Sequence, residues 1–170
     1  MKIRKRHFLR SGELKALKNL IVENLGQKAL NAIPKGANLE LVVFDDGTYL
    51  YMVDGKPCFF KKGGKIFPTI LFLDNFSIDL PKVVIDLGAV ARVSKGADIM
   101  VPGITHIYKK FQRGDIVIVV EEKHERVIAV GIALMEYDEI VKSEKGKAIR
   151  NIHHVGDKLW KTINTIIKSE

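Results

Sequence analysis

The fold of the second half of the chain is decided by residues 86–104, which read DLGAVARVSKGADIMVPGI. The run Val83-Val84-Ile85 just before them is apolar and β-branched, and it predicts a buried strand. Within the stretch, Val90 and Val93 lie at helical spacing and predict about one and a half turns of helix. Gly96 follows, and a glycine there favours the left-handed backbone conformation that ends a helix.

Short strands separated by turns continue through the rest of this half. Residues 97–101 are the next expected strand, and Pro102-Gly103 form a turn after it. Further strands are expected over 116–121 and 127–135, with the charged residues 123–126 as the turn between them. After Asp157, a final helix is predicted by apolar residues at helical spacing: Leu159, Ile163, Ile166 and Ile167. Trp160 is better explained by packing on this side of the helix than by stacking on a base.

The first half predicts one helix packed on a meander of short antiparallel strands. We expect Ser11 to cap the helix and Gly26 to end it. Its apolar face is formed by Leu14, Leu17, Leu20, Ile21 and Leu25. Strands are expected over 39–44, 48–53, 57–60 and 66–67, joined by tight turns rich in Asp and Gly. One helix followed by a run of strands indicates an α+β fold.

Composition places limits on the class of protein. The 170 residues are 46% apolar, which is enough for one domain or two small ones. No segment approaches the roughly eighteen consecutive apolar residues of a membrane span, and we expect no secretory signal, no membrane and a cytoplasmic location. Cys58 is the single cysteine, so no internal disulfide can form. The net charge of +8 favours polyanionic partners such as nucleic acid, although a lysine-rich surface also simply maintains solubility.

The sequence contains little that points to catalysis or to a metal. Gly63-Gly64-Lys65 is followed by Ile66 instead of Ser or Thr, so it is not a phosphate-binding loop of the Walker type. His153 and His154 are neighbours in an expected strand, where adjacent side chains point to opposite faces and cannot easily hold one metal ion. We therefore expect no enzyme activity, no metal and no cofactor.

The second half resembles the PUA domain, a small RNA-binding barrel. The resemblance rests on an ordered series of small and turn residues: Gly88-Ala89, Gly96-Ala97, Pro102-Gly103-Ile104, Gly114-Asp115, Gly131 and Gly146-Lys147-Ala148. It implies a PUA pseudo-barrel over residues 81–160, with the helix 157–168 packing on that barrel. An α+β unit over residues 1–80 that precedes such a barrel resembles the malignant-T-cell-amplified-sequence family, the matching N-terminal part of ligatin and short archaeal relatives.

The resemblance also implies where RNA would bind. In PUA domains RNA commonly lies against the short helix, the loop after it and the adjoining strand. Transferred to this sequence, with two later basic residues as a rim, the RNA-binding residues are Gly88, Ala89, Arg92, Lys95, Gly96, Ala97, Pro102, Gly103, Lys147 and Arg150. The small residues would let backbone groups approach RNA, and the basic ones would reach phosphates. Simpler explanations are turn geometry for the glycines and solvated charge for the basic residues. A secondary basic patch, or merely a charged terminus, is formed by Arg4, Lys5, Arg6 and Arg10.

The family resemblance implies a non-catalytic RNA-binding protein that acts on tRNA or small-subunit rRNA in translation initiation or ribosome recycling. The expected partners are RNA, the small ribosomal subunit and a second translation protein. Two alternatives remain open at this point. The chain is either an RNA-binding accessory subunit of an RNA-modification enzyme, or a protein–protein scaffold whose PUA barrel no longer binds RNA.

Overall fold

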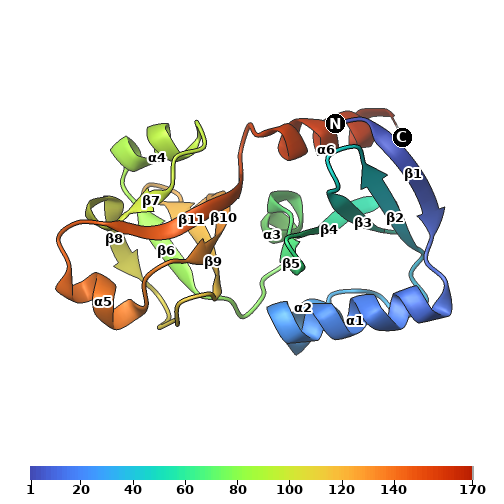
Figure 1. Cartoon of the computed structure of the whole chain (residues 1–170), viewed down its shortest axis with the longest axis horizontal. Coiled ribbons are helices and arrows are strands. Elements are labelled where there is room, and N and C mark those ends of the chain that lie inside the picture. Colours follow the sequence, from blue (N-terminus) through green and yellow to red (C-terminus); the bar gives the residue numbers. More distant parts are fainter. Residues whose placement is uncertain (170) are drawn as a thin grey trace. The chain divides into compact units, whose positions relative to one another are not determined.

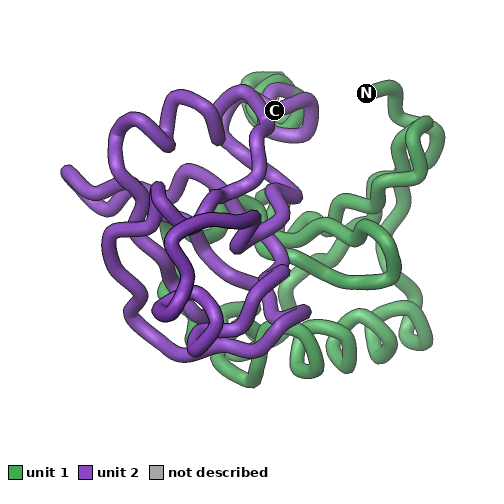
Figure 2. The backbone as a smooth tube through the Cα atoms, turned by 60° about the vertical axis from the view of Figure 1, so that its left-hand side comes forward, with its two compact units in different colours: residues 1–79, 162–170 green, residues 80–161 purple. Residues whose placement is uncertain are grey.

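The protein, here a computed structural model, is described over residues 1–169 and divides into two compact units. Unit 1 comprises Met1–Asp79 together with the chain from Thr162 onward, and unit 2 comprises Leu80–Lys161 (Figure 2). The boundary after Asp79 lies beside the one predicted from the sequence. The C-terminal segment differs from the prediction, because the chain from Thr162 onward groups with unit 1 and not with the barrel.

Unit 1 is a five-stranded antiparallel meander with helices α1, α2 and α3, and it also contains most of the final helix (Figure 1). The strands follow one another in the order β1-β2-β3-β4-β5. Its elements are β1 (Ile3–Phe8), α1 (Ser11–Leu25), α2 (Gln27–Asn31), β2 (Leu39–Phe44), β3 (Tyr49–Val53), β4 (Lys56–Lys62), β5 (Lys65–Pro68) and α3 (Ile70–Asn75). This arrangement confirms the predicted α+β class, with a helix on an antiparallel meander.

Helix α1 shows how local sequence sets an element boundary. Leu17, Ile21 and Leu25 are buried, as the helical spacing predicted. The predicted cap at Ser11 is wrong, because Ser11 is already the first helical residue and Arg10 occupies the cap position. The backbone N–H of Arg10 instead donates to Glu13 Oε2 at 2.9 Å, so a carboxylate one turn into the helix satisfies it.

Three elements of unit 1 were not predicted: the short helix α2, strand β1 and helix α3. The last two show why. The basic segment of β1 reads as a charged terminus, yet it pairs with β2 along the edge of the sheet. Helix α3 starts after Thr69, whose hydroxyl accepts from the Phe72 N–H at 3.1 Å and donates to the Pro57 carbonyl at 2.8 Å. Both elements depend on partners that are remote in sequence, so the local pattern gave no signal.

Unit 2 is built on one six-stranded sheet in the order β7-β11-β10-β9-β6-β8. Strands β6 and β9 pair in parallel, and the other pairs are antiparallel. Its elements are β6 (Lys82–Ile85), α4 (Leu87–Val93), β7 (Ile99–Met100), the 3-10 turn η1 (Val101–Gly103), β8 (Ile104–Ile107), β9 (Ile116–Glu121), β10 (Val127–Ala133), α5 (Tyr137–Lys142) and β11 (Lys147–His154). The strand expected over 97–101 shortens to β7, because Val101 begins the 3-10 turn.

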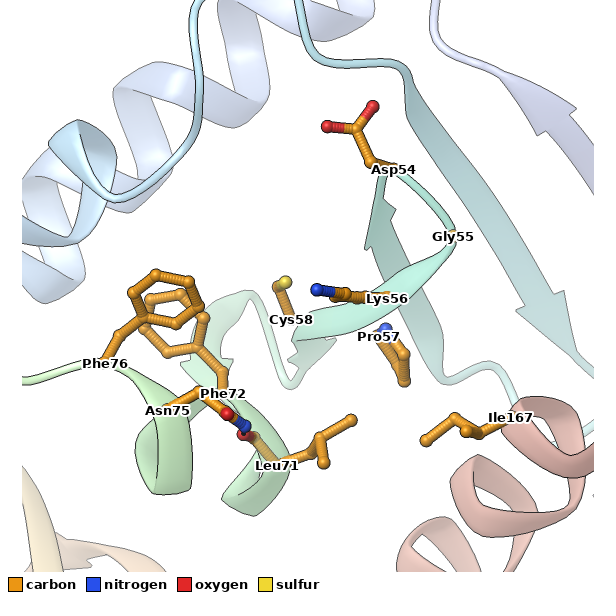
Figure 3. Close-up of a pocket in the computed structure, with 10 residues that line it drawn as sticks. All are labelled: Asp54, Gly55, Lys56, Pro57, Cys58, Leu71, Phe72, Asn75, Phe76 and Ile167. Atoms are coloured by element: carbon orange, nitrogen blue, oxygen red, sulfur yellow. Dashed lines mark hydrogen bonds between the residues drawn. The ribbon is translucent and has the colours of Figure 1, made fainter.

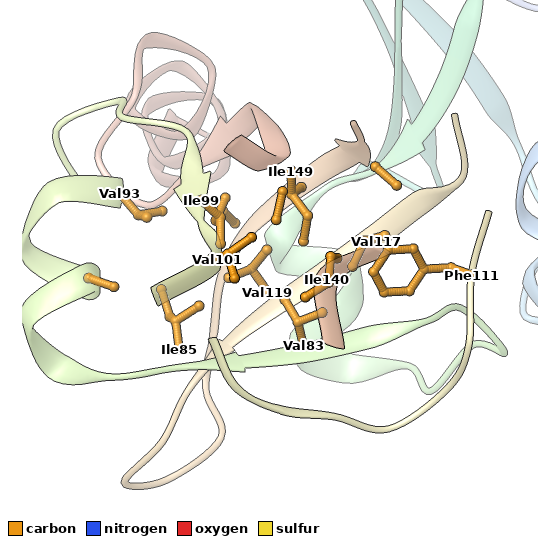
Figure 4. Close-up of a cluster of buried hydrophobic side chains, with 14 residues drawn as sticks. Val83, Ile85, Val93, Ile99, Val101, Phe111, Val117, Val119, Ile140 and Ile149 are labelled. Atoms are coloured by element: carbon orange, nitrogen blue, oxygen red, sulfur yellow. The ribbon is translucent and has the colours of Figure 1, made fainter. Parts of the chain in front are cut away.

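The strands of unit 2 enclose one apolar core (Figure 4). Helix α4 contributes Val93 to this core, and the sheet contributes Val119 from β9 and Ile149 from β11. Gly131 in β10 is required by close backbone packing, because a Cβ at this position would lie 2.4 Å from the Arg150 carbonyl oxygen. Close packing therefore explains the glycine that marks this strand in the sequence.

Helix α6 (Lys158–Ser169) begins in unit 2 and continues in unit 1. Its buried residues include Ile163 and Ile166. Ile167 lies on the wall of a pocket of unit 1, beside Leu71 and Pro57 (Figure 3). From Thr162 onward, α6 therefore groups with unit 1, whereas the whole helix was predicted to pack on the barrel. Within residues 1–169, no helix is long and apolar enough to cross a membrane.

Candidate nucleic-acid interface

Helix α4 presents a basic outer face and buries its other face in the barrel. Gly88, Arg92 and Lys95 follow one another at i, i+4 and i+7, and all three are exposed. On the opposite side, Ala89 and Val93 belong to the core. The first turn is fixed by the Asp86 carboxylate, which accepts from the Ala89 N–H at 2.7 Å. The outer face of α4 therefore carries the positive charges of Arg92 and Lys95, and at Gly88 it has no side chain.

The loop after α4 continues this face. Gly96 has φ +96°, a left-handed conformation that a glycine adopts without strain, and its N–H donates to the Val93 carbonyl at 2.9 Å. Ala97 follows with an exposed methyl group, and its N–H donates to the Arg92 carbonyl at 3.2 Å. The chain thus turns sharply and presents almost no side chain over two residues. A ligand can approach the backbone closely at this point.

Strand β11 clamps this loop through Asn151. The side-chain amide of Asn151 donates to the carbonyls of Val93 and Ala97, both at 3.0 Å. Its backbone N–H donates to Asp98 Oδ1, also at 3.0 Å. Three hydrogen bonds from one residue therefore fix both ends of the loop. Asn151 was not predicted from the sequence, because an isolated Asn in a strand carries no signal of such a role.

The two predicted basic rim residues separate in the structure. Lys147 Nζ lies 3.5 Å from Asp98 Oδ2, next to the loop, and both side chains retain solvent exposure. Arg150 pairs with Ile132 of β10. The two neighbours of Ile132 in that strand, Gly131 and Ala133, face the core. Side chains alternate along a strand, so Arg150 projects from the opposite side of the sheet. The structure brings Lys147 to the loop and leaves Arg150 away from it.

Two of the small residues predicted to bind RNA are buried instead. Ala89 is 5% exposed, and Gly103 is also buried. A Cβ on Gly103 would lie 2.8 Å from the Cβ of Ala89, so this pair allows helix α4 to pack tightly on η1. Their small size serves packing and offers no surface to RNA. The exposed residues that remain together are Gly88, Arg92, Lys95, Gly96, Ala97 and Lys147, and we call them the α4 surface. Pro102 is exposed as well, on η1.

All four residues of the secondary basic patch are exposed, but at least one of them is paired within the protein. Arg6 makes two hydrogen bonds to the Glu40 carboxylate, at 2.7 Å and 3.0 Å. On the other face of β1, His7 Nε2 lies 3.1 Å from Glu13 Oε1. The Arg10 backbone N–H, the His7 side chain and the charge of Lys5 all hold the pKa of Glu13 below its ordinary value. Lys5 and Arg6 therefore lie on opposite faces of β1, and the charge of Arg6 is already paired with Glu40.

The adjacent histidines point to opposite faces, as the strand prediction required. His153 is 1% exposed, and its Nδ1 lies 2.8 Å from Asp157 Oδ2. Burial raises the pKa of Asp157, but hydrogen bonds from His153, from the Trp160 N–H and from the His154 N–H outweigh burial and lower it overall. This carboxylate also caps α6, because Oδ1 accepts from the Trp160 N–H at 2.6 Å. His154 faces the loop, with Nε2 3.5 Å from where a Cβ on Gly96 would sit.

Unit 1 holds an apolar pocket of about 530 Å³ (Figure 3). Its walls come from the β3–β4 turn, β4, α3 and α6, and they include Phe72 and Phe76. Cys58 also lines this pocket, but burial raises the pKa of its thiol to about 11. A thiol with this pKa stays protonated at neutral pH and reacts slowly. The pocket is therefore suited to packing against an apolar group, and Cys58 is not placed as a nucleophile.

Two family models match the chain, one in each half. The model described as PUA domain matches residues 81–155, and the model described as domain of unknown function (DUF1947) matches residues 5–75. A crystal structure of a PUA domain from Aeropyrum pernix K1 superposes with a TM-score of 0.85 at 27% identity, covering 97% of this chain and 93% of that one. The predicted PUA barrel is confirmed.

Relatives similar over most of their length extend this result to the whole chain. An uncharacterized protein of Methanocaldococcus jannaschii is 41% identical over 94% of this chain and 98% of its own. Translation machinery-associated protein 20 of Saccharomyces cerevisiae is 37% identical over 75% and 74%, and Malignant T-cell-amplified sequence 2 of Homo sapiens is 33% identical over 89% and 88%. The chain therefore belongs to the family of PUA-domain proteins that contains Translation machinery-associated protein 20 and the Malignant T-cell-amplified sequence proteins.

Proposed function

We propose that this protein is a non-catalytic RNA-binding protein of the translation machinery. It binds structured RNA, either tRNA or small-subunit rRNA, through the α4 surface. It acts in the cytoplasm during initiation or ribosome recycling, together with the small ribosomal subunit and a second translation protein. The relation to Translation machinery-associated protein 20 supports the link to translation, and the PUA match supports RNA as the ligand.

The observation that carries the proposal is the composition of the α4 surface. Arg92, Lys95 and Lys147 supply cations around a loop of Gly96 and Ala97 that is nearly free of side chain. Cations bind phosphates, and bare backbone lets a nucleotide approach closely enough for hydrogen bonds. Asn151 and Asp98 hold the loop in one conformation before binding. A preformed site loses less conformational entropy when it binds its ligand.

The proposal is tested by charge reversal. The double variant Arg92→Glu/Lys95→Glu should weaken binding to deacylated tRNA and to isolated small subunits by more than tenfold. The slope of log affinity against log salt should also become shallower, by about 0.7 to 0.9 for each phosphate that the variant no longer neutralises. Ala97→Glu adds one negative charge at an exposed methyl group, so it should weaken binding while the melting temperature stays unchanged.

The matched control is Lys123→Glu/Arg126→Glu in the β9–β10 turn. It replaces the same two residue types, both exposed and in the same unit, and it lowers the net charge from +8 to +4 just as the first variant does. Binding that depends on the α4 surface should be weakened more than tenfold in the first variant and largely kept in the control. Equal weakening in both would mean that net charge alone drives binding. Wild-type protein that binds neither RNA nor subunits would overturn the proposal.

A further inference from the structure

The ring of His154 borders the α4 surface from β11. Its partner across the sheet is Ala129, and the partner of Asn151 is Gly131. The register shift between Val130 and Gly131 places one extra residue in β11, so His154 and Asn151 lie on the same face although they are three residues apart. The nearest described atom to the open space beside Gly96 is His154 Nε2, which lies 3.5 Å from the position of a Cβ on that glycine. Since Gly96 has no side chain, nothing at this residue stands between the ring nitrogen and a bound ligand.

The tautomer of His154 follows from its other ring nitrogen. Nδ1 lies 3.0 Å from the Val155 carbonyl oxygen. A carbonyl oxygen can only accept, so Nδ1 carries a hydrogen and the neutral ring keeps its lone pair on Nε2. Within residues 1–169, Nε2 makes no hydrogen bond to the protein. The neutral ring therefore presents a fixed and unused acceptor.

This acceptor differs from the three cations of the α4 surface, and it differs from the Asp98 carboxylate, which already lies near Lys147 and receives the Asn151 N–H. Arg92, Lys95 and Lys147 are donors and suit phosphate oxygens. The carbonyl of Ala97 is an acceptor, but it already receives the Asn151 amide at 3.0 Å. His154 Nε2 thus adds a side-chain acceptor at the loop, which phosphate cannot satisfy. It matches a nucleotide donor, either a ribose 2′-hydroxyl or an exocyclic amino group of a base.

We infer that His154 is a specificity-determining residue of the RNA site, and that its Nε2 accepts a hydrogen bond from a nucleotide bound over Gly96. The inference rests on the proposed function, because it requires that RNA binds the α4 surface. It adds that recognition there extends beyond phosphate charge. Discrimination arises because a ligand that lacks the donor leaves the acceptor unpaired after water has been displaced.

The experiment compares full-length wild type, His154→Ala and His154→Gln on three synthetic probes. The first probe is a tRNA acceptor-stem hairpin with four unpaired 3′ nucleotides. The second carries 2′-deoxyribose at those four positions. The third lacks the exocyclic amino groups of the unpaired bases. Wild type should bind one of the altered probes five- to tenfold more weakly than the first, and the affected probe identifies the donor. His154→Ala should bind the first probe five- to tenfold more weakly and lose this discrimination.

The Gln variant and a second histidine serve as controls. The Gln side chain keeps an acceptor oxygen near the same place, so His154→Gln should recover part of the discrimination if it melts like wild type. His124→Ala removes an exposed histidine from the β9–β10 turn and should change nothing. The inference is overturned if wild type treats all three probes alike, or if His154→Ala keeps the discrimination or weakens all probes equally. Wild type that binds isolated small subunits but none of the probes would also overturn the inference, and wild type that binds neither would refute the proposed function.

Discussion

Replacing Asn151 by Ala tests whether the loop of the α4 surface must be held in place. The substitution removes the two side-chain hydrogen bonds to Val93 and Ala97, each at 3.0 Å, and keeps the backbone bond to Asp98. Two such bonds contribute about 1 kcal/mol each. The destabilisation is reduced because the Val93 carbonyl still receives the Gly96 N–H at 2.9 Å. It is reduced further because Asn151 Oδ1 is buried without a hydrogen-bond partner, and the substitution removes that atom.

We therefore expect Asn151→Ala to lower the free energy of unfolding by about 1–2 kcal/mol. At this chain length that corresponds to roughly 2–8 °C in the melting temperature. The loop must then be ordered when RNA binds, at a cost of about 1–2 kcal/mol for one residue, so affinity should fall roughly five- to thirtyfold. Denaturation followed by the fluorescence of Trp160, the single tryptophan, and RNA titration at fixed salt measure the two effects.

Asn151→Asp provides the sharper comparison. It keeps the shape of the side chain but turns the donor amide into a carboxylate oxygen that faces two carbonyl oxygens. It should therefore be less stable than Asn151→Ala and bind RNA more weakly still. The reasoning is refuted if Asn151→Ala binds RNA as tightly as wild type, or if Asn151→Asp is the more stable of the two.

Three further predictions concern packing and buried groups elsewhere in the two units. Gly131→Ala should cost about 3 kcal/mol or more, or prevent folding, because the new Cβ would lie 2.4 Å from the Arg150 carbonyl oxygen and 2.5 Å from Ile149 Cγ2. Gly12→Ala, where nothing lies within 4 Å, should be neutral or stabilising in the same denaturation assay. The pKa of Asp157 is lowered on folding, so its contribution to stability should be present above the ordinary Asp pKa of about 3.9 and disappear as pH falls through the lower folded value. Asp157→Asn should accordingly be less stable at pH 7 and show a weaker dependence on acid pH, and a parallel acid dependence in both proteins would contradict this assignment. The pKa of about 11 for Cys58 means that an aromatic disulfide reagent at pH 8 should modify the folded protein about a hundredfold or more slowly than the unfolded chain, and equal rates would show that this thiol is not buried.

Much of the architecture was readable because its signals are local. Apolar periodicity predicted α1, and the β2–β3 strands and their turn were placed within a residue or two of their observed bounds. Turn residues marked the hairpins: Asp54-Gly55 and Gly63-Gly64 both have positive φ, as tight hairpin turns require. Elements such as β1 escaped prediction because a basic strand at a sheet edge is defined by its partner strand and not by its own composition.

The sequence by itself determined the α+β class, the PUA resemblance and the basic, glycine-containing stretch after β6, because each depends on residue types and spacings along the chain. Only the tertiary structure decided which of those residues share a surface. It buried Ala89 and Gly103 against each other and sent Arg150 to the other face of β11. It also brought Asn151 and His154 to a loop more than fifty residues earlier in the chain. The physical reason is that strand register and bulges set which way a side chain points, and register is fixed by pairing between strands distant in sequence.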